Sequence, residues 1–460
     1  MLVPGDAIRS ATHVYKVTAL LGEGNQGAVF EAHDGTAVRW ALKWYHESYI
    51  DCDRTLRHRI EHLVQEGPPN DRFLWPVDII EKPGQASFGY AMALREPRFR
   101  GLTDLMSARC EPPPTFRAIL TASIELTHCF LMLHAMGLCY RDISFGNCFF
   151  DPATGEVRIC DNDNVDVNGT SSVVMGTTGF IAPELVTGEH RSPDVESDLF
   201  SLAVLLFYLQ MVAHPLEGAR ESGIRCFDEA AKRHIYGTHP LFIFDPNDDS
   251  NRPVRGIHDN AFAFWPLYPQ VLRDAFEQAF VRGLVPSYAA LDTPGARAAG
   301  VATSRASRVR EGEWRDILLA TRDAIFPCAS CGAENFYDAS RLRVGGGPGD
   351  CWSCARTLAL PARLRIQGQN QERLVMMVPG ARLYGHHLDP LRAFRLEAPA
   401  AEVTRHPSDP TRIGLTNLSP DEWVYRNPDG KAQSVARGRS CALANGARIS
   451  FGKMIGEVRL

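Results

Sequence analysis

The 460-residue chain lacks an excess of positive charge. Its 49 lysines and arginines are outnumbered by 54 aspartates and glutamates, so the formal net charge is −5. This balance gives no electrostatic reason to expect binding to nucleic acid or to an anionic membrane surface. The sequence also shows no internal repeat and no signal-peptide pattern at its start. We therefore expect a cytoplasmic protein that binds neither nucleic acid nor a membrane.

Long hydrophobic runs are also scarce. The most apolar run, residues 199–212, is interrupted by Tyr208 and Gln210, and no other segment approaches the ~20 residues of a membrane span. Hydrophobic residues nevertheless make up 45% of the chain, which is enough for globular cores. Because 460 residues exceed what a single hydrophobic core holds, we expect two or three domains.

A glycine-rich segment near the start fits a phosphate-binding pattern. Residues 21–29 read LGEGNQGAV and match GxGxxGxV, in which the glycines let backbone N–H groups approach a phosphate and the valine covers an adenine. Residues 14–21 and 28–32 are predicted strands, and no helix pattern follows the glycines. This order argues against a dinucleotide-binding βαβ unit, whose glycines lead into a helix.

The next predicted strand, residues 37–45, carries a lysine among apolar neighbours. Lys43 stands where it would grip the α- and β-phosphates of a nucleotide. A lysine partly removed from water needs a carboxylate to keep it charged. In the predicted helix over 56–63 the candidate is Glu61, and Glu66, next to a Gly-Pro-Pro break, is the alternative.

A second motif combines an acid and an amide. Residues 140–147 read YRDISFGN. In this spacing Asp142 can orient and deprotonate a hydroxyl nucleophile, and Asn147 can hold a metal ion that bridges nucleotide phosphates. The spacing alone also fits an ordinary surface loop.

A predicted strand downstream would deliver another carboxylate. Residues 157–160 read as a strand that ends in the sequence Asp-Asn-Asp. Its first residue, Asp161, would supply a second metal ligand beside Asn147. Asp163 is the alternative ligand.

The motifs together carry a family resemblance. Residues 176–184 read GTTGFIAPE, and Asp198 opens the apolar run described above. In this order, residues 12–326 resemble a eukaryotic-like (Hanks-type) bacterial protein kinase domain. The resemblance implies an α+β protein with the bilobal protein-kinase fold, residues 12–95 forming the small lobe and 96–326 the large lobe. It also implies ATP and Mg2+ (or Mn2+) as cofactors and a protein as substrate.

The resemblance further implies a role for each motif residue. Glu184 would form a buried ion pair with Arg308, and Asp198 would bind the backbone of the catalytic loop. The catalytic residues would be Asp142 as base, Lys43 paired with Glu61, and the metal ligands Asn147 and Asp161. The nucleotide-binding residues would be Leu21, Gly22, Gly24, Gly27, Val29, Ala41, Lys43, Asn147 and Asp161.

Two departures from the family pattern stand out. Ser144 occupies the place where Ser/Thr kinases usually carry a lysine, and loss of that charge should slow a reaction that depends on electrostatic stabilisation. Asn162 replaces the usual phenylalanine. We expect phosphorylation of Ser/Thr hydroxyls of a protein partner and of the chain itself. A pseudokinase scaffold that binds nucleotide and docks partners is the alternative. A small-molecule phosphotransferase is disfavoured by the Ala-Pro-Glu sequence at 182–184.

The arginine beside Asp142 suggests regulation. Arg141 could pair with a phosphate on the activation segment and thereby order it. For Thr177 and Thr178 we favour simple hydrogen bonding to the loop and substrate. The candidate phosphate acceptors are Thr170, Ser171, Ser172, Thr177 and Thr178.

Four of the 12 cysteines form two CxxC pairs, in residues 328–331 and 351–354. Each pair can place two thiolates on one side of a tetrahedral ion, so the set closes a structural zinc site. Disulfides and a redox CxxC are the alternatives, and zinc is favoured because the other cysteines are scattered. The stretch 327–360, which would form a zinc ribbon, is too short for a core of its own. The predicted Zn2+ ligands are Cys328, Cys331, Cys351 and Cys354.

Residues 361–460 alternate short apolar segments with turns, which predicts an all-β sandwich. The segment vaguely resembles a forkhead-associated domain, but the Ser-x-x-His part of that family's phosphothreonine site has no good match. Gly385-His386-His387 comes nearest, and both histidines are interpreted as ordinary loop residues rather than ligands. Arg382 would supply the arginine of such a site. We expect this segment to dock an unphosphorylated partner or the kinase lobe. The apolar segments are 373–378, 381–384, 393–396, 423–425, 441–443 and 447–451.

The whole arrangement is similar to kinases encoded with a von Willebrand-type protein and a metal-dependent Ser/Thr phosphatase. That resemblance implies these two proteins as partners. A further expectation concerns residues 287–307, whose Ala, Gly, Ser and Thr content suggests an excursion before the last helix of the large lobe.

Overall fold

The computed structural model divides the chain into two compact units. The first comprises residues 1–265 and 273–316, and the second comprises residues 266–272 and 317–460. Residues 317–326 lie in the second of these units. The expected excursion at 287–307 lies outside the described residues, which are 1–36, 38–284, 308–368, 372–389, 391–392 and 394–460.

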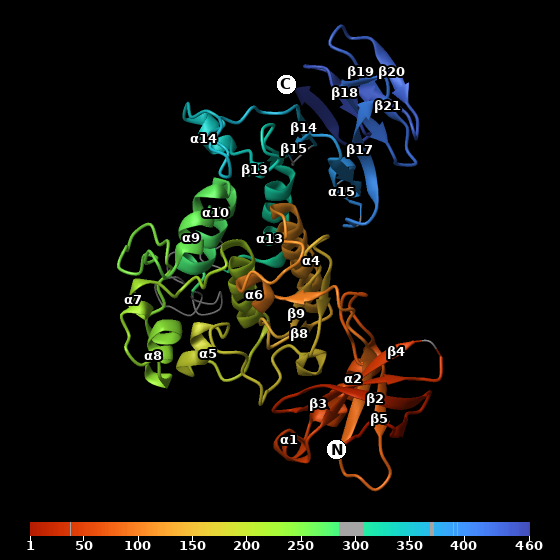
Figure 1. Ribbon diagram of the computed structural model, residues 1–460, viewed down its shortest axis with the longest axis vertical. Helices are drawn as coiled ribbons and strands as arrows, with labels where there is room; N and C mark the ends of the chain where they lie inside the picture. Colours follow the sequence, from red (N-terminus) through yellow and green to blue (C-terminus); the bar gives the residue numbers. More distant parts are fainter. Residues whose placement is uncertain (37, 285–307, 369–371, 390, 393) are drawn as a thin grey trace, which may run out of the picture. The chain divides into compact units, whose positions relative to one another are not determined.

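The first unit begins with a closed antiparallel barrel, drawn in red and orange in Figure 1. Its strand order is β1-β2-β3-β4-β6-β5, and β1 closes it by pairing with both β2 and β5. Inward side chains such as Tyr15, Val17, Phe30 and Leu42 form one hydrophobic core. The elements are β1 (Ala7–Arg9), β2 (Val14–Glu23), β3 (Gly27–His33), β4 (Arg39–Tyr45), α1 (Glu47–Cys52), α2 (Leu56–Glu66), β5 (Asp78–Glu81) and β6 (Phe88–Ala93).

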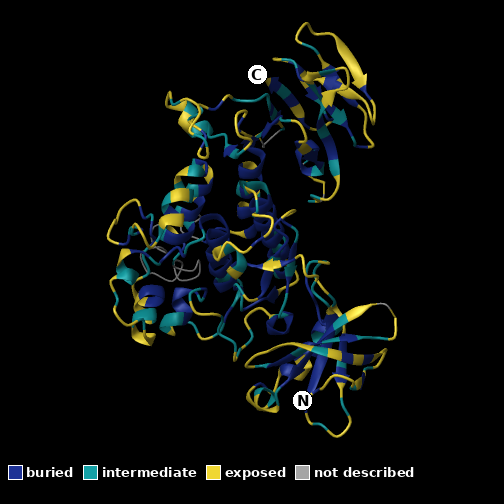
Figure 2. Cartoon of the chain, in the orientation of Figure 1, coloured by how far each residue is buried: buried dark blue, intermediate teal, exposed yellow. Residues whose placement is uncertain are grey.

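The rest of the first unit is built around helix α6 (Val195–Met211). Asp194 and Ser197 form a capping box at its start, and every residue from 197 to 211 is buried, as the dark blue colour in Figure 2 shows. A helix that is apolar on all sides belongs in a core. Gln210 Nε2 donates to Ser123 Oγ of helix α4 (Phe116–Ala135) at 2.7 Å, which joins the two central helices.

Short elements surround these two helices. The helices are α3 (Leu102–Met106), α5 (Pro183–Thr187), α7 (Ala219–Ser222), α8 (Glu229–Arg233) and α9 (Asp259–Phe264), with α10 (Gln270–Glu277) and α13 (Glu311–Asp323) crossing the unit boundary in sequence. The strands are β7 (Arg100–Gly101), β8 (Leu138–Cys139), β9 (Cys148–Phe150), β10 (Val157–Ile159) and β11 (Asp166–Val167). Single 3-10 or π turns cover Asn162–Asn164, His234–Thr238, Trp265–Leu267 and Gln278–Arg282.

Helix α4 corrects one expectation from the sequence. Among the described residues it is the one helix long and apolar enough to cross a membrane by length and composition, with a mean hydropathy of 1.4. The buried share of its apolar window is 72%, so it has the surroundings of a core helix. Because a fully buried helix and a membrane span can have the same composition, the length and composition of α4 are weak evidence of a span.

The described part of the second unit contains a small cysteine-bearing element with the two-stranded sheet β12-β13, and two larger β-sheets. The six-stranded sheet has the order β15-β14-β23-β22-β19-β20, and the four-stranded sheet has the order β16-β17-β18-β21. Both sheets contribute to one hydrophobic core that includes Leu364, Leu415 and Trp423. The elements are β12 (Ile325–Pro327), β13 (Glu334–Phe336), α14 (Ala339–Arg343), β14 (Arg363–Gln367), β15 (Glu372–Met376), β16 (Arg382–Tyr384), α15 (Gly385–Leu388), β17 (Pro399–His406), β18 (Asp409–Asn417), β19 (Trp423–Arg426), β20 (Ala432–Val435), β21 (Ser440–Ala442), β22 (Arg448–Ser450) and β23 (Ile455–Arg459).

Five of the six apolar segments predicted here overlap strands. The exception is 393–396, where residue 393 lies outside the described residues and 394–396 are not in a strand.

The two neighbouring histidines are core residues rather than ordinary loop residues. His387 is fully buried, lies 2.9 Å from Asp323 Oδ2 through Nε2, and accepts from the Tyr384 N–H at Nδ1. The ring of His386 stacks on Tyr384 at a centroid distance of 5.9 Å, and neither of its nitrogens has a hydrogen-bond partner among the described residues. Burial lowers the pKa of His386 to about 2.

This burial predicts an acid-sensitive second unit. Below the ordinary histidine pKa of about 6.5 the unfolded chain takes up a proton at His386 that the folded protein cannot accept, so unfolding becomes easier by about 1.4 kcal/mol per pH unit. We expect His386→Phe to remove this part of the slope between pH 6.5 and 5. Denaturant unfolding of the full chain across that range measures it. His406→Gln, at an exposed position, is the matched control, and an unchanged slope in His386→Phe would refute the assignment.

Candidate active site

The first turn of α6 holds the catalytic loop, residues 140–147, in place. Asp198 is 1% exposed, and its two oxygens accept from the backbone N–H groups of Tyr140 (2.6 Å) and Arg141 (2.9 Å). The loop bends sharply here, with Arg141 at a φ of 75°. The predicted contact of Asp198 with this backbone is confirmed.

A buried histidine supports Asp198. His134 Nε2 lies 3.1 Å from Asp198 Oδ2, and its Nδ1 contacts Glu311. Burial alone would favour the neutral ring, but the hydrogen bonds to the two carboxylates raise the pKa of His134 to about 9. A protonated imidazole is therefore held between two negative charges.

The predicted ion pair of the large lobe is also present. Arg308 Nη1 and Nη2 each lie 2.8 Å from an oxygen of Glu184, and Arg308 is 2% exposed. Its Nε donates to the carbonyl of Gly283. A bidentate pair of this kind fixes both partners in orientation as well as distance.

Asp142 and Asn147 lie together at the end of the loop. Asn147 Nδ2 donates to the backbone carbonyl of Asp142 at 2.7 Å and to its Oδ2 at 3.1 Å. The Thr177 hydroxyl donates to Asp142 Oδ1 at 2.7 Å, as the hydrogen-bonding interpretation of Thr177 predicted. Burial raises the pKa of Asp142, and the bonds from Thr177 and Asn147 act in the opposite direction. The Asp142 carboxylate thus accepts a hydrogen bond from a hydroxyl group, as expected of a base.

Arg141 points to the activation segment. Its Nη2 donates to the backbone carbonyl of Thr170 at 3.1 Å and contacts the Thr170 hydroxyl, while Nη1 lies 3.3 Å from Asp166 Oδ2. Of the candidate phosphate acceptors, Thr170 is therefore the one in contact with Arg141 among the described residues.

Lys43 is buried and surrounded by acids from the segment after β10. Its Nζ lies 2.8 Å from Asp163 Oδ2 and 3.5 Å from Asp161 Oδ1. Burial opposes the charge of Lys43, but the two carboxylates outweigh it and raise the pKa of the lysine. The Asp161 side chain is 41% exposed, and the φ of this residue is 48°.

The predicted pairing of Lys43 with Glu61 is wrong. Glu61 is 41% exposed and accepts from Arg57 Nε at 2.9 Å, one helical turn earlier. The buried positions of α2 include Leu56, Ile60 and Arg59. Because consecutive residues of a helix are rotated by about 100°, position 61 turns away from the face that position 60 buries. The alternative, Glu66, is exposed at the end of the same helix and lies near His62.

A cavity of about 370 Å3 lies in the first unit, and Gly24, Gly27, Lys43 and Asn147 are not among the residues that line it. Of the residues predicted to bind nucleotide, Leu21, Gly22, Val29, Ala41 and Asp161 line it. No sequence motif indicated a nucleotide contact for the other lining residues, which are Leu74, residues 92–95, Gly146, Phe149 and Cys160. Apolar side chains such as Leu21, Val29 and Leu74 among the lining residues suit a largely apolar ligand group such as a heteroaromatic ring.

The glycine-rich turn lies between β2 and β3. A Cβ on Gly27 would lie 2.2 Å from the carbonyl oxygen of Trp44, so only glycine permits this approach of β3 to β4. A Cβ on Gly22 or Gly24 would meet nothing within 4 Å, which leaves the turn open on its outer side. Gln26 Oε1 accepts from Lys43 Nζ at 2.8 Å, a contact that the GxGxxG pattern does not indicate.

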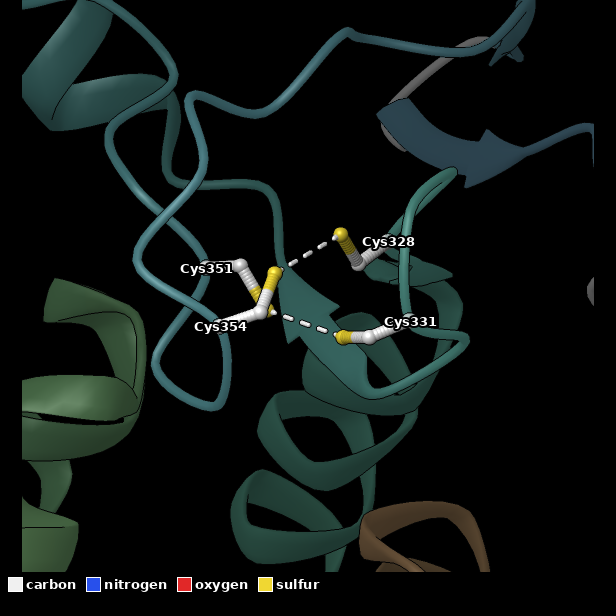
Figure 3. Close-up of side chains that lie close together, drawn as sticks. All are labelled: Cys328, Cys331, Cys351 and Cys354. Carbon is white, nitrogen blue, oxygen red and sulfur yellow. Dashed lines mark hydrogen bonds between the residues drawn. The ribbon is translucent and has the colours of Figure 1, made fainter.

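The four predicted zinc ligands converge in the second unit. Figure 3 shows the side chains of Cys328, Cys331, Cys351 and Cys354 pointing toward one another. The sulfurs lie within 4.8 Å of each other, with 3.8 Å between Cys328 and Cys354 and 3.6 Å between Cys331 and Cys351. Tetrahedral zinc with bonds of about 2.3 Å would separate its sulfurs by about 3.8 Å, so the cluster fits that ion. Backbone N–H groups of Cys331 and Ser330 lower the pKa of Cys328, which favours a thiolate.

Known protein kinases are similar to this chain. The family described as "Protein kinase domain" matches residues 15–251. The DNA damage-responsive serine/threonine-protein kinase RqkA of Deinococcus radiodurans is 28% identical over 258 residues, which cover 54% of this chain and 35% of that protein. Serine/threonine-protein kinase PknA of Mycobacterium tuberculosis is 35% identical over 226 residues, covering 44% and 48%.

A solved structure is also similar. The PknI kinase domain of Mycobacterium tuberculosis is 18% identical, with a TM-score of 0.43, and the match covers 70% of this chain and 99% of that one. The matched region spans about a third to a half of the length of these curated relatives.

The His134 network predicts a base-sensitive catalytic loop. Because the folded pKa of about 9 lies above the unfolded value, the stabilisation is fully present below about pH 6.5 and is lost as the pH rises through 9. We expect His134→Gln to lower the free energy of unfolding by roughly 2–3 kcal/mol at pH 7 and by much less at pH 9.5. Denaturant unfolding at both pH values measures the difference. His58→Gln, at an exposed position, is the control, and an equal loss at both pH values would contradict the charge state.

Proposed function

The chain belongs to the protein kinase family, and from that premise we propose that it is a Ser/Thr protein kinase that uses ATP and Mg2+ to phosphorylate a protein partner and itself. The observation that best supports the proposal is the Thr177 hydroxyl bound to Asp142 Oδ1 at 2.7 Å. A serine or threonine of a substrate would present the same group to the same carboxylate.

In this proposal Asp142 orients the acceptor hydroxyl and takes its proton. Burial raises the pKa of this carboxyl, and a stronger base accepts the proton more readily once the hydroxyl oxygen bonds to phosphorus. Asn147 holds Asp142 in place through two hydrogen bonds. The acceptor oxygen then approaches the γ-phosphate in line with the leaving oxygen.

ATP would lie in the 370 Å3 cavity. Leu21, Val29 and Ala41 would cover the adenine, and the backbone of the open turn at Gly22, Gly24 and Gly27 would cover the phosphates. Lys43 would donate to the phosphates, exchanging its bond to Gln26 for one to a phosphate oxygen. Asn147 and Asp161 would hold Mg2+, which when bound neutralises phosphate charge.

The position of Ser144 bears on rate. The side chain stands where the family usually carries a lysine, and Ser144 is 3% exposed. No positive charge from this position can stabilise the transferring phosphoryl group, so we propose slow turnover relative to kinases that have the lysine.

For the second unit we propose a zinc ribbon followed by a forkhead-associated-like β-sandwich. Arg382, the candidate arginine of a phosphopeptide site, lies 3.4 Å from Glu402. A carboxylate so close would repel a phosphate, which favours docking of an unphosphorylated partner. A von Willebrand-type protein and a metal-dependent Ser/Thr phosphatase are proposed partners on resemblance alone, and a cytoplasmic location is proposed with them.

The first test removes the base. Asp142→Asn should reduce phosphate transfer by roughly 100-fold to 10,000-fold, with ATP affinity within about threefold of wild type because Asp142 acts on the hydroxyl and not on the nucleotide. Asp161→Asn should instead abolish the tightening of ATP binding by Mg2+. Asp51→Asn, on the surface of the same unit, is the matched control. Wild-type protein that binds ATP and transfers nothing would overturn the enzyme proposal and favour a nucleotide-binding scaffold.

The second test concerns zinc. Purified full-length protein should contain one zinc ion per chain, and replacing Cys328 and Cys351 together by serine should abolish it, because half of the ligands are lost. Nucleotide affinity should be unchanged, since the cavity residues lie in the first unit. Replacing the exposed Cys52 and Cys226 is the control. Metal-free protein with disulfides among the four cysteines would contradict the site.

A further inference from the structure

Among the described carboxylates, the one of Asp163 lies nearest to the buried ammonium of Lys43, and the amide oxygen of Gln26 also accepts from it. Lys43 is 4% exposed, and its Nζ lies 2.8 and 3.0 Å from the two oxygens of Asp163. Asp161 is more distant at 3.5 Å. Glu61, the helix carboxylate expected in this role, is instead paired with Arg57 on the surface.

The Asp163 carboxylate is held in place by a prebuilt set of donors. Tyr45 and Tyr90 donate their hydroxyls to Asp163 at 2.7 and 3.3 Å. Tyr45 lies two residues after Lys43 on β4, so both side chains share one face of the strand. Tyr90 stands opposite Lys43 on the neighbouring strand β6. Three donors therefore converge on a carboxylate that is 1% exposed.

Helix α2 reaches the same residue through its backbone. Arg59 Nε donates to the Asp163 carbonyl at 2.8 Å, and its Nη2 lies 2.7 Å from Asp53 Oδ2. Arg59 is 7% exposed, so the inward face of the helix presents a cation where a Lys43–carboxylate pair would need an anion. The helix is thus tied to Asp163 and not to Lys43.

Asp161 and Asp163 differ in whether their carboxylates are free to bind a metal ion. The Asp161 side chain is 41% exposed and lines the cavity. Asp163 would have to give up Lys43 and two tyrosine hydroxyls before it could bind a metal ion. We propose that Asp163 is the positioning residue for Lys43, in place of a carboxylate on helix α2, and that Asp161 alone of the two faces the bound metal and nucleotide. This inference rests on the proposed function of the cavity.

A double-mutant cycle tests the pair. In the full chain, Asp163→Asn should weaken the Mg2+-dependent binding of a fluorescent ATP analogue at least tenfold, because Lys43 loses its orientation. In a Lys43→Met background the same change should alter the affinity less than twofold. Glu61→Gln should change affinity less than twofold in both backgrounds. Residues that act as a pair show this non-additivity.

Two outcomes would overturn the inference. A tenfold loss in Glu61→Gln would return the role to the helix. An equal loss from Asp163→Asn in both backgrounds would mean that Asp163 acts through Tyr45 and Tyr90 and not through Lys43.

The unfolding temperature gives a second measurement that does not depend on activity. Lys43→Met leaves the buried Asp163 charge without its cation and should lower the unfolding temperature. Adding Asp163→Asn removes that charge and should recover part of the loss, even if Asp163→Asn alone folds poorly. A double variant no more stable than Lys43→Met would contradict the pair.

If the wild type fails to transfer phosphate but the cycle shows coupling, only the proposed function fails. If it transfers and the coupling is absent, only this inference fails.

Discussion

A buried ammonium group is the constraint on which the first unit depends. Lys43 is almost entirely removed from water, and an ion in that position must be paired because its desolvation costs several kcal/mol. The acid comes from the turn after β10, so one ion pair joins the barrel strand β4 to the segment that carries Asp161. Tyr45 and Tyr90 on the barrel, and Arg59 on α2, complete the enclosure. The cavity residues are therefore positioned by a polar network and not by apolar packing alone.

A second polar network holds the catalytic loop from the opposite side. Helix α6 is buried along its length, yet its first turn presents Asp198 to two backbone N–H groups of the loop. His134 pairs with the Asp198 carboxylate through one ring nitrogen and with Glu311 through the other. These groups leave Asp142 with only short-range freedom, because the residues just before it are bound to a rigid helix. A base that must meet a hydroxyl in one geometry benefits from this restriction.

The sequence predicted those parts of the site in which a residue type at fixed spacing has one physical use. The glycine turn and the strands that flank it follow from such motifs. The Asp198 contact and the Glu184–Arg308 pair were implied by the resemblance to protein kinases. The partner of Lys43 could not be predicted in this way. Helix phase decides whether Glu61 faces inward, and a shift of one residue, about 100°, reverses the answer. Asp163 lies 120 residues after Lys43, at a position for which no role in binding the lysine was expected.

Outside the motifs, prediction depended on hydrophobic patterning. Strands β19 and β22 were found because they overlap the short apolar segments 423–425 and 447–451. Strands β17 and β18 were missed because Thr404, Arg405 and Arg412 lower their apolar content, although the two strands pair along most of their length. The buried histidines were misjudged because a polar residue in a turn-rich segment gives no sign that aromatic rings cover it.

The most direct test of the account is phosphoryl transfer by the unmodified chain. Full-length protein incubated with Mg2+ and ATP labelled in the γ-phosphate, alone and with a general protein acceptor, should become labelled on serine or threonine, and mass spectrometry should locate the phosphate. ATP bound with measurable affinity but no label on either protein would contradict the assignment of Asp142 as a catalytic base.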